Sequence, residues 1–569
     1  MSNIDSTAAY TALCERNGIS MNEITYRFVI RGIKVPLKPE WLKAEDYDNA
    51  AFSAAAKILK CSAFFGRLTN PKFAVYKKSV DARKRNELLF VYSVMFEYGA
   101  GFRIKNDAAL VSACEKEGIE IVPNSPFDFP EAHSDYRPVI VGFGPCGMFA
   151  SLVLAKAGLR PIVLERGADV DTRQKAVDAY WSKGELDTET NVQFGEGGAG
   201  TFSDGKLLTR INDPLCAFVL ETFHKHGAND DILTNAKPHI GTDKLRLIVK
   251  SIRREAEACG AEIRFNTRLD GCSFDSSGRI ASLTVNGEKN AVSTDALFLC
   301  MGHSARDTFG KLYSNGIDIV PKPFSVGVRI EHLQSKIDEA LYGESVGHPA
   351  LPKGEYALSH RDGDRAVYTF CMCPGGTVVA SSSEKDGIVT NGMSCYARDG
   401  INANSAVAVS VGLDDLERRD DPFSAMDFQR RIEASAFDLA HGGAPVMTVG
   451  DFLGKGASAG INVTPTYTGR TENRDIRKVF PPFVSDMLKE GILRFEKKIR
   501  GFSDAGAMLT APETRTSSPV RMPRGELRTA EKYPCVYPCG EGAGYAGGIT
   551  SAAVDGIKTA LAYIENLKR

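Results

Sequence analysis

The strongest hydrophobic pattern along the chain is an apolar run broken by glycines at residues 138–167. Its sequence, PVIVGFGPCGMFASLVLAKAGLRPIVLERG, is typical of a buried strand, a glycine turn, an apolar helix and a second buried strand. Residues 139–159 are apolar enough to resemble a membrane span, but Gly142 and Gly144 within them favour the strand–turn–helix interpretation. We therefore expect a βαβ unit here and no membrane span.

The pattern continues in the same way further along the chain. Residues 245–259 have helical spacing, AEIRFNTRLDGCSF and RIASLTVNG alternate like strands, and DALFLCMG predicts a buried strand followed by a turn. From about residue 321 to 502, alternating strand patterns and short helices dominate. Residues 535–569 return to strand, glycine turn and helix. The predicted fold class is therefore α/β, with a Rossmann-like nucleotide-binding domain that is interrupted by an inserted α+β domain.

A different order of elements precedes this domain. ITYRFVIRGIKV alternates like a strand, DYDNAAFSAAAKILK has helical spacing, KFAVYKKSVDARKRNELLFVYSVMFEY predicts strand, basic loop and strand, and VSACEKEGIEIV predicts a helix leading into a strand. The order βαββαβ predicts a small ferredoxin-like domain. The expected domains are a polar leader at 1–20, the ferredoxin-like α+β domain at 21–130, the nucleotide-binding domain at 136–320 and 503–569, and an inserted substrate or cap domain at 321–502.

Composition narrows the class of protein. A chain of 569 residues is expected to form roughly two to four domains. The 70 basic and 71 acidic residues almost balance, so no overall charge favours nucleic acid or an anionic membrane as partner. The N-terminus has no basic region followed by an apolar one, which predicts no signal peptide. Thirteen scattered cysteines, an odd number, favour reduced thiols in a cytoplasm.

The glycine turn of the βαβ unit carries the first chemical signal. Gly142 permits a tight turn, Gly144 lets the backbone approach a pyrophosphate, and Gly147 allows close packing of helix on strand. The helix N-terminus then offers free N–H groups to phosphate. Glu165 ends the next strand, ~20 residues on, where a carboxylate accepts hydrogen bonds from ribose hydroxyls and repels a 2′-phosphate. The sequence thus predicts a dinucleotide site that disfavours NADP.

Three later stretches separate FAD from NAD as the ligand. They are the glycine-rich loop at residues 191–210, the turn at Gly302 and the segment GEGAGYAGGI at residues 540–549. Together with the first turn they resemble the FAD proteins of the glutathione-reductase-like FAD/NAD(P)-binding superfamily. That resemblance implies that Glu541 contacts the ribityl–phosphate part of FAD. It also implies that residues 547–550, at a helix N-terminus, lie beside the flavin ring and stabilise its reduced, anionic form.

A narrower resemblance covers residues from about 70 to the C-terminus. The stretches KKSVDAR, VGFGPCGMFASL, GGAGTFSDGKL, MGHSARDTF, PFSVGVRIEH, TFCMCPGG, ETRTSSPVR and CGEGAGYAGGI are similar to a bacterial family of FAD-dependent dehydrogenases or oxidoreductases, mostly uncharacterised. The resemblance implies FAD as cofactor and names no substrate. The residues expected to bind FAD are Gly142, Gly144, Pro145, Cys146, Gly147, Glu165, Arg166, Gly200, Thr201, Gly302, Gly540, Glu541, Gly547, Gly548 and Ile549.

Candidates for the reacting groups come from three stretches. Arg515 and Arg521 lie in a hydroxyl-rich segment that can bind a carboxylate or phosphate, or can be a solvated loop. Cys371, two residues before Cys373, can take part in a redox relay to the flavin or can be a structural cysteine. His303 is a candidate acid–base group, and so is His332, although both can equally be hydrogen-bonded core histidines.

The expected function is an FAD-dependent oxidoreductase that acts on an unidentified small molecule by hydride transfer at flavin N5, and an anionic molecule is one candidate. NAD(P)H is left open as a transient electron donor, because no second glycine fingerprint indicates a dedicated nicotinamide domain. No paired metal-ligand spacing is found, so no metal is expected. The alternative is a flavin-containing RNA-modifying or RNA-binding protein that uses the basic loop at residues 77–85. The sequence does not determine the oligomeric state.

Overall fold

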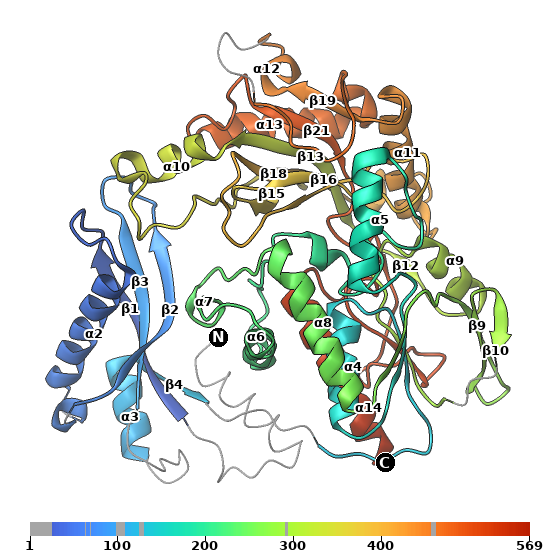
Figure 1. The fold of residues 1–569 in the computed structure, drawn as a ribbon, viewed down its shortest axis with the longest axis horizontal. Helices are drawn as coiled ribbons and strands as arrows, with labels where there is room; N and C mark the ends of the chain where they lie inside the picture. The colour runs from blue at the N-terminus through green and yellow to red at the C-terminus, as the bar shows by residue number, and fades with distance from the viewer. Residues whose placement is uncertain are drawn as a thin grey trace.

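A computed structural model describes residues 26–62, 64–68, 70–97, 108–123, 130–290, 294–456 and 463–568. The polar leader expected at residues 1–20 lies outside these residues. Among them, no helix combines the length and the apolar character that crossing a bilayer requires. The predicted α/β class is confirmed, because the described residues alternate strands and helices around several sheets (Figure 1).

The sheet that positions the candidate site has five parallel strands. Its spatial order is β23-β11-β5-β6-β7, which in chain order is 5-4-1-2-3, the arrangement of a doubly wound dinucleotide-binding fold. Each strand is only three residues long, and β5, β6, β11 and β23 are buried throughout. The bounds are β5 Val139–Val141, β6 Ile162–Leu164, β7 Glu262–Arg264, β11 Leu297–Leu299 and β23 Val536–Pro538.

Three helices pack on one another beside this sheet, α4, α8 and α14 (Figure 1). Helix α4 is buried along nearly its whole length, which explains the membrane-like hydrophobicity of its sequence. Leu152, Ile252 and Ile557 represent the three helices in the shared apolar core. The bounds are α4 Pro145–Lys156, α8 Thr242–Ala258 and α14 Ile549–Leu567. The other helices of this part of the chain are α5 Val170–Lys183, η3 Ala199–Phe202, α6 Leu215–Lys225, α7 Asp231–Thr234 and α9 Arg306–Ser314.

A three-stranded antiparallel meander, β10-β9-β8, extends the chain between β7 and β11. Helix α9 packs against its strand β8. The bounds are β8 Leu269–Phe274, β9 Ile280–Val285 and β10 Glu288–Asn290.

Between β11 and β23 the chain builds a second sheet of seven strands, in the order β14-β15-β18-β13-β21-β19-β20. Strand β21 belongs to this sheet, so the boundary expected at residue 502 falls too early. The bounds are β12 Val320–Pro321, β13 Phe324–Leu333, α10 Gln334–Tyr342, η4 Gly343–Ser345, β14 Ser359–Asp362, β15 Arg365–Cys373, β16 Thr377–Ala380, β17 Thr390–Met393, β18 Asn402–Val411, η5 Leu413–Asp415, α11 Ser424–Leu439, β19 Ala444–Thr448, α12 Val449–Phe452, β20 Thr471–Asn473, η6 Ile476–Val479, α13 Pro482–Glu496, β21 Met508–Glu513 and β22 Val520–Arg521.

The N-terminal unit forms a separate four-stranded antiparallel sheet, in the order β2-β3-β1-β4, that lies to the left in Figure 1. Its elements follow the order β-α-β-β-α-β along the chain. Helix α2 packs on the sheet, where the rings of Tyr47 and Phe90 are in contact in the core at a tilt of 52°. The bounds are β1 Tyr26–Pro36, α2 Ala44–Cys61, η1 Phe65–Arg67, β2 Phe73–Asp81, β3 Leu89–Phe96, α3 Ala108–Glu117 and β4 Ile119–Pro123.

The basic loop expected at residues 77–85 is in part wrong. Residues 77–81 are the end of strand β2, and only the remainder forms a turn. The Lys77 ammonium contacts the carbonyl oxygens of Leu233 and Asn235, and Lys78 forms an ion pair with Asp48. Lys77 therefore joins the N-terminal unit to the end of helix α7, and Lys78 ties strand β2 to helix α2 within the unit. These observations give no support to an RNA-binding surface.

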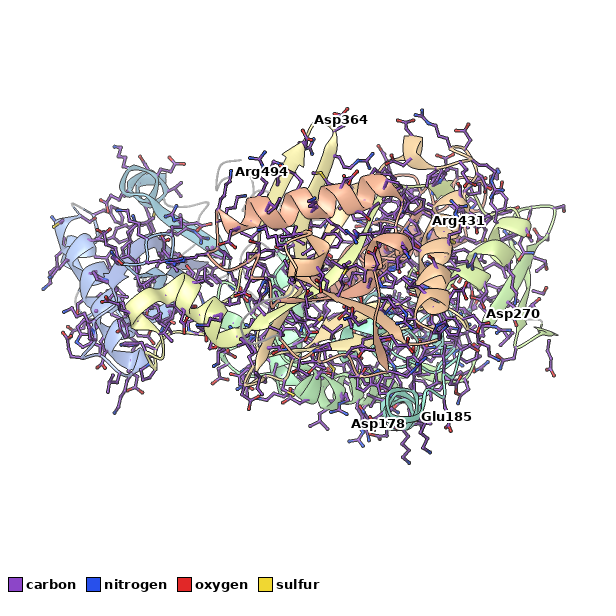
Figure 2. The ribbon with its side chains drawn as sticks, turned by 90° about the horizontal axis from the view of Figure 1, so that it is seen from above. Asp178, Glu185, Asp270, Asp364, Arg431 and Arg494 are labelled. Atoms are coloured by element: carbon purple, nitrogen blue, oxygen red, sulfur yellow. The ribbon has the colours of Figure 1, made fainter. Side chains whose placement is uncertain are left out.

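Charged side chains otherwise gather at the periphery. Figure 2 shows Asp364, Arg431 and Arg494 pointing away from the second sheet and its helices. Against this background a small set of charged residues is almost completely buried, among them Arg173 and Arg329. Because burying an unpaired charge is costly, these residues mark places where the fold depends on specific polar contacts.

Candidate functional site

The glycine turn after β5 has the geometry that its sequence predicts. Gly142 has φ of 94°, and a Cβ there would lie 3.0 Å from the Met301 Cα. A Cβ on Gly147 would lie 1.9 Å from the Gly142 carbonyl oxygen, so this glycine lets helix α4 pack on the turn. Around Gly144 a Cβ would meet only the Gly198 Cα at 3.7 Å. The space beside Gly144 is thus open toward a ligand.

Glu165 lies at the end of β6 and is 5% exposed. One carboxylate oxygen accepts a hydrogen bond from Phe143 N–H at 2.8 Å. The other accepts from Gly167 N–H and Gly195 N–H, both at 2.9 Å. These contacts fix the carboxylate beside the glycine turn. A carboxylate offers about four acceptor positions, so one remains for a hydroxyl of a bound ligand.

The glycine-rich loop at residues 191–210 is fixed by a buried residue that the sequence pattern did not reveal. Arg173 on α5 is fully buried and donates to the carbonyl oxygens of Asn191, Val192 and Glu196 at 2.7–2.8 Å. Burial lowers the pKa of Arg173 to about 10. Because this guanidinium binds three backbone carbonyls of the loop, it fixes the segment whose Gly198 approaches Gly144.

A histidine that follows β11 and an acid that follows β23 lie in contact, although they are far apart in the sequence. His303 Nδ1 lies 2.9 Å from a Glu541 carboxylate oxygen, and His303 Nε2 is buried without a hydrogen-bond partner. Burial alone would raise the pKa of Glu541, but His303 outweighs it and lowers this pKa below its usual value. Helix α14 begins just beyond, after Gly548, and neither it nor α4 has an acidic residue in its first turn. Both helices therefore present an uncompensated positive end.

These groups border one cavity of about 330 Å³. It begins at the glycine turn and Glu165, passes the loop around Gly198 and reaches the start of α14. Most of the residues expected to bind FAD line it, namely Gly142, Gly144, Pro145, Cys146, Glu165, Arg166, Gly200, Gly302, Glu541, Gly547, Gly548 and Ile549.

Three of the expected FAD-binding residues lie outside the cavity wall and support it instead. Gly147 and Gly540 are packing positions, since a Cβ on Gly540 would lie 2.8 Å from Cys146 Sγ. The Thr201 hydroxyl is buried and donates to the Glu196 carbonyl within the glycine-rich loop. Direct contact with a ligand is therefore not expected of these three.

The second sheet supplies the facing wall, where Arg515 is the main cation. Arg515 Nε and Nη2 donate to the carboxylate of Glu433 on α11 at 2.9 and 3.1 Å. Arg306 on α9 binds the same carboxylate. Burial disfavours ionised Glu433, but Arg515 and Arg306 outweigh burial and lower the pKa of Glu433. Arg515 Nη1 is buried and has no partner, although Arg515 lines the cavity. It is a donor still available to an anion.

Cys371 lies on this wall at a break in strand β15. The strand shifts register between Phe370 and Cys373, and Cys371 has φ of 44°. The Cys373 thiol hydrogen-bonds that of Cys371, which together with Arg329 and Lys206 lowers the pKa of Cys371 to about 6 despite burial. A thiol at this position is largely ionised at neutral pH.

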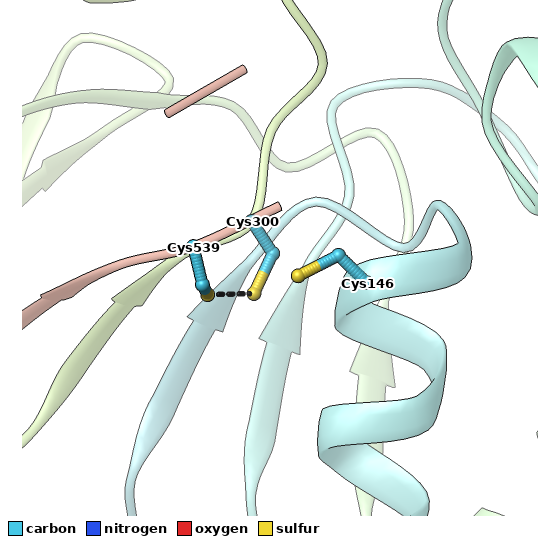
Figure 3. A group of neighbouring side chains, drawn as sticks. All are labelled: Cys146, Cys300 and Cys539. Atoms are coloured by element: carbon cyan, nitrogen blue, oxygen red, sulfur yellow. Dashed lines mark hydrogen bonds between the residues drawn. The ribbon is translucent and has the colours of Figure 1, made fainter. Parts of the chain in front are cut away.

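Three more thiols meet below the glycine turn, from Cys146 at the start of α4, Cys300 after β11 and Cys539 after β23 (Figure 3). Their sulfur atoms lie within 4.8 Å of one another, and Cys300 Sγ is 3.1 Å from Cys539 Sγ. Burial opposes ionisation of Cys539, but hydrogen bonds from the other two thiols lower its pKa to about 5. The sequence pattern did not reveal this cluster, because its members come from three separate segments.

Two residues considered from the sequence are not at the cavity. Arg521 is exposed, donates to the Gly544 carbonyl at 3.2 Å and lies 4.8 Å from the Tyr545 ring centre. The pairing of β22 with β12 turns this arginine away from Arg515. His332 is buried in the second domain and its Nε2 lies 2.9 Å from the Phe502 carbonyl oxygen. Arg521, expected from the sequence among the reacting groups, thus lies away from the cavity that Arg515 lines.

Comparisons with known proteins give a family. Residues 323–516 match the family model described as FAD-dependent protein, C-terminal domain-like. The chain is 44% identical over 499 residues to an uncharacterized protein of Clostridium beijerinckii, covering 86% of this chain and 92% of that protein. The matched model ends after β21, which agrees with the assignment of that strand to the second sheet.

Solved structures are similar at a much lower level. A geranylgeranyl bacteriochlorophyll reductase-like protein from Thermoplasma acidophilum has 12% identity and a TM-score of 0.32, covering 75% of this chain and 77% of that chain. Glycine oxidase from Geobacillus kaustophilus has 11% identity and a TM-score of 0.33, covering 76% and 95%. L-proline dehydrogenase from P. horikoshii has 12% and 0.31, covering 76% and 93%. These similarities carry no argument about activity.

Proposed function

The chain belongs to the family of FAD-dependent proteins that includes its Clostridium beijerinckii relative, and we propose that it is an oxidoreductase that transfers hydride between a small anionic molecule and flavin N5. The cofactor is FAD. The observation that carries the proposal is the single cavity that joins the glycine turn, Glu165 and the start of α14 to the cationic wall of the second sheet.

The residues at the cavity suit FAD in their chemistry. The free N–H groups at the start of α4 suit a pyrophosphate, and the fixed carboxylate of Glu165 suits the hydroxyls of a ribose. The unpartnered His303 Nε2 is a hydrogen-bonding atom held at the wall by Glu541. These groups would hold the nucleotide end and the middle of the cofactor.

At the other end the chain stabilises charge and orients substrate. Bound FAD supplies a ring that accepts or donates hydride at N5. The N-terminus of α14 places its partial positive charge beside the cavity at Gly547 and Gly548, where a reduced, anionic ring would be favoured. Arg515 Nη1 would bind the carboxylate or phosphate of a substrate, because its other nitrogens are already fixed by Glu433.

The proposal is tested by flavin content and flavin reduction. The purified protein is expected to be yellow with one FAD per chain, and an anaerobic screen of hydride donors, NADH and NADPH included, is expected to bleach it. Small anionic donors are expected to bleach the wild type but not Arg515→Met. A folded, colourless protein that takes up no added FAD would refute the function.

Gly144 provides the sharpest variant. A Cβ at this position meets no protein atom closer than 3.7 Å and the space beyond it opens into the cavity, so Gly144→Ala and Gly144→Asn are expected to fold. Gly144→Asp adds a negative charge in the pyrophosphate path and is expected to abolish FAD binding, while Gly144→Asn only weakens it. Equal flavin content in the Asp and Asn variants would show that the pyrophosphate does not bind at this turn.

The proposal includes the domain organisation. The parallel sheet is taken as the FAD-binding domain, the seven-stranded sheet as an inserted substrate domain, and the N-terminal sheet as a ferredoxin-like domain. Support comes from the chain order, since the second sheet lies between β11 and β23 of the first.

A further inference from the structure

The proposed hydride transfer leaves one feature of the cavity wall unused, the pair Cys371 and Cys373. Both are free thiols at the end of strand β15. Cys371 lines the cavity, whereas Cys373 is fully buried behind it. One thiol is thus open to a ligand and its partner is protected.

The backbone brings these two thiols together. In a regular strand, residues two apart have Cα atoms roughly 6.6–6.8 Å from each other, at the upper limit for a disulfide. Here β15 breaks register between Phe370 and Cys373, and Cys371 adopts the left-handed region with φ of 44°. At this break the Cys373 thiol donates to the Cys371 carbonyl oxygen, with Sγ 3.3 Å from that oxygen. A non-glycine residue in this region is strained, and such strain concentrates at functional sites.

The surroundings favour a thiolate at Cys371. Arg329 Nη1 donates to the Cys371 carbonyl oxygen at 2.9 Å and is itself fixed by Glu513. Lys206, which also lines the cavity, adds a second positive charge. The pKa of Cys373 is raised well above its usual value, chiefly by its hydrogen bond with Cys371 and by burial. Both pKa shifts favour a thiolate at Cys371 and a protonated thiol at Cys373.

We propose that Cys371 and Cys373 are a second two-electron centre, a dithiol–disulfide couple that exchanges electrons with the flavin bound in the same cavity. This inference rests on the proposed function. In the reducing direction the S–S bond breaks, Cys371 leaves as thiolate, and Cys373 takes one proton. The two electrons and this proton come from the reduced, anionic flavin, which becomes oxidised, so charge and hydrogen balance.

A dithiol–disulfide couple at the cavity wall suits one class of substrate, the small disulfides. The Cys371 thiolate attacks one sulfur of the disulfide, which forms a mixed disulfide with Cys371 and releases the other half of the substrate as a thiolate. Cys373 then attacks Cys371 Sγ, gives up its proton and releases the second thiol. Reduced flavin restores the pair, and a hydride donor such as a reduced nicotinamide replenishes the flavin. Leu208 and Phe370, 60% and 37% exposed at the cavity, provide apolar contact for the substrate.

The test counts electrons in the flavin-containing protein. Anaerobic dithionite titration of the air-oxidised wild type is expected to consume four electrons per FAD, two for the flavin and two for the disulfide. Cys371→Ser and Cys373→Ser are expected to consume two. Cys272→Ser is the matched control, a buried thiol outside the cavity wall, and is expected to consume four.

Peptide mapping provides a second measurement on the wild type alone. Alkylation before reduction is expected to leave Cys371 and Cys373 joined, and alkylation after reduction is expected to modify both. A wild type that binds FAD but consumes only two electrons, with both thiols free in air, would overturn the inference. That outcome differs from failure of the proposed function, in which no flavin is bound.

Discussion

At the scale of single residues, the site depends on charges that are buried and paired. Glu433 is 3% exposed and receives hydrogen bonds from Arg306 and Arg515, which belong to α9 and to the segment after β21. The arginine that faces the cavity is therefore held by a carboxylate from another element. Because Glu433 fixes the other two guanidinium nitrogens, it also sets the orientation of Nη1, which has no partner.

Removal of this carboxylate is expected to be costly. Glu433→Gln leaves two buried guanidinium groups without their counter-charge and should lower the free energy of unfolding by about 3–5 kcal/mol. Glu417→Gln, which removes the exposed partner of Arg431, is the control and should change it by less than about 1 kcal/mol. Urea unfolding at pH 7 measures both variants. Equal, small effects would show that the network does not stabilise the fold.

The same network predicts a dependence on pH. The folded pKa of Glu433 is below the ordinary 4.5, so its contribution to stability is present above pH 4.5 and is lost as the pH falls through the folded value. The difference in unfolding free energy between wild type and Glu433→Gln is therefore expected to narrow when urea unfolding is repeated at increasingly acid pH. A difference that widens with acid would contradict the assigned direction.

Cys371 provides a second titration. In the reduced protein its rate of alkylation by iodoacetamide should rise with pH through a midpoint of about 6, because only the thiolate reacts. Cys373→Ala removes the main cause of the shift and should move this midpoint up toward 9.0. Peptide-resolved mass spectrometry measures the rate, with Cys395, whose pKa is raised, as internal control. An unchanged midpoint in Cys373→Ala would show that Cys373 is not the cause of the lowered pKa of Cys371.

At the scale of elements, glycines set how closely the helices approach the cavity. Gly556 lies in α14, and a Cβ there would lie 2.2 Å from the Cys146 carbonyl oxygen in the first turn of α4. The start of α4 is thus held directly against the backbone of α14, about two turns beyond the α14 N-terminus. The buried guanidinium of Arg173 has the same role for the glycine-rich loop.

Separation of α14 from α4 is expected to affect both stability and cofactor. Gly556→Ala should destabilise the protein by about 1–3 kcal/mol and lower its flavin content, because the added methyl group forces the helices apart. Gly310→Ala in α9 is the matched control, since no atom lies within 4 Å of its Cβ position. Thermal unfolding and flavin absorbance measure both. Full flavin content in Gly556→Ala would show that the helix spacing is not critical.

At the scale of the whole molecule, the N-terminal unit and the cavity are separate. None of the described residues 26–123 lines the cavity. The unit contacts the remainder through Lys77 at α7 and through Lys38 and Tyr47 at His348. These contacts bring it beside both larger domains without closing the site (Figure 1).

A chain that begins at residue 130 should therefore keep its cofactor. Its flavin content and flavin spectrum are expected to equal those of the full chain, with some loss of stability because Ala350 and Leu351 lose their apolar contacts. Absorbance after gel filtration measures the flavin. Loss of FAD from a folded, truncated chain would place the N-terminal unit in the site. The double variant Lys77→Met, His348→Ala in the full chain tests the same contacts without truncation.

Local sequence determined the elements nearest the cofactor. The turn at Gly142, the helix that follows and Glu165 lie within one βαβ unit, and their positions depend on backbone conformations that the residue types dictate. The α/β class followed from the same periodicity. The resemblance of the later motifs then identified FAD, which the family comparison supports.

The tertiary structure alone decided which distant side chains meet. Cys300 and Cys539 are 239 residues apart and become neighbours because β11 pairs with β23. Arg515 and Arg521, close in sequence, separate because β21 joins the second sheet and β22 pairs elsewhere. Such contacts depend on the order of strands in a sheet, which periodicity along the chain does not encode. The sequence therefore identifies the motifs, and the fold selects which of them share the cavity.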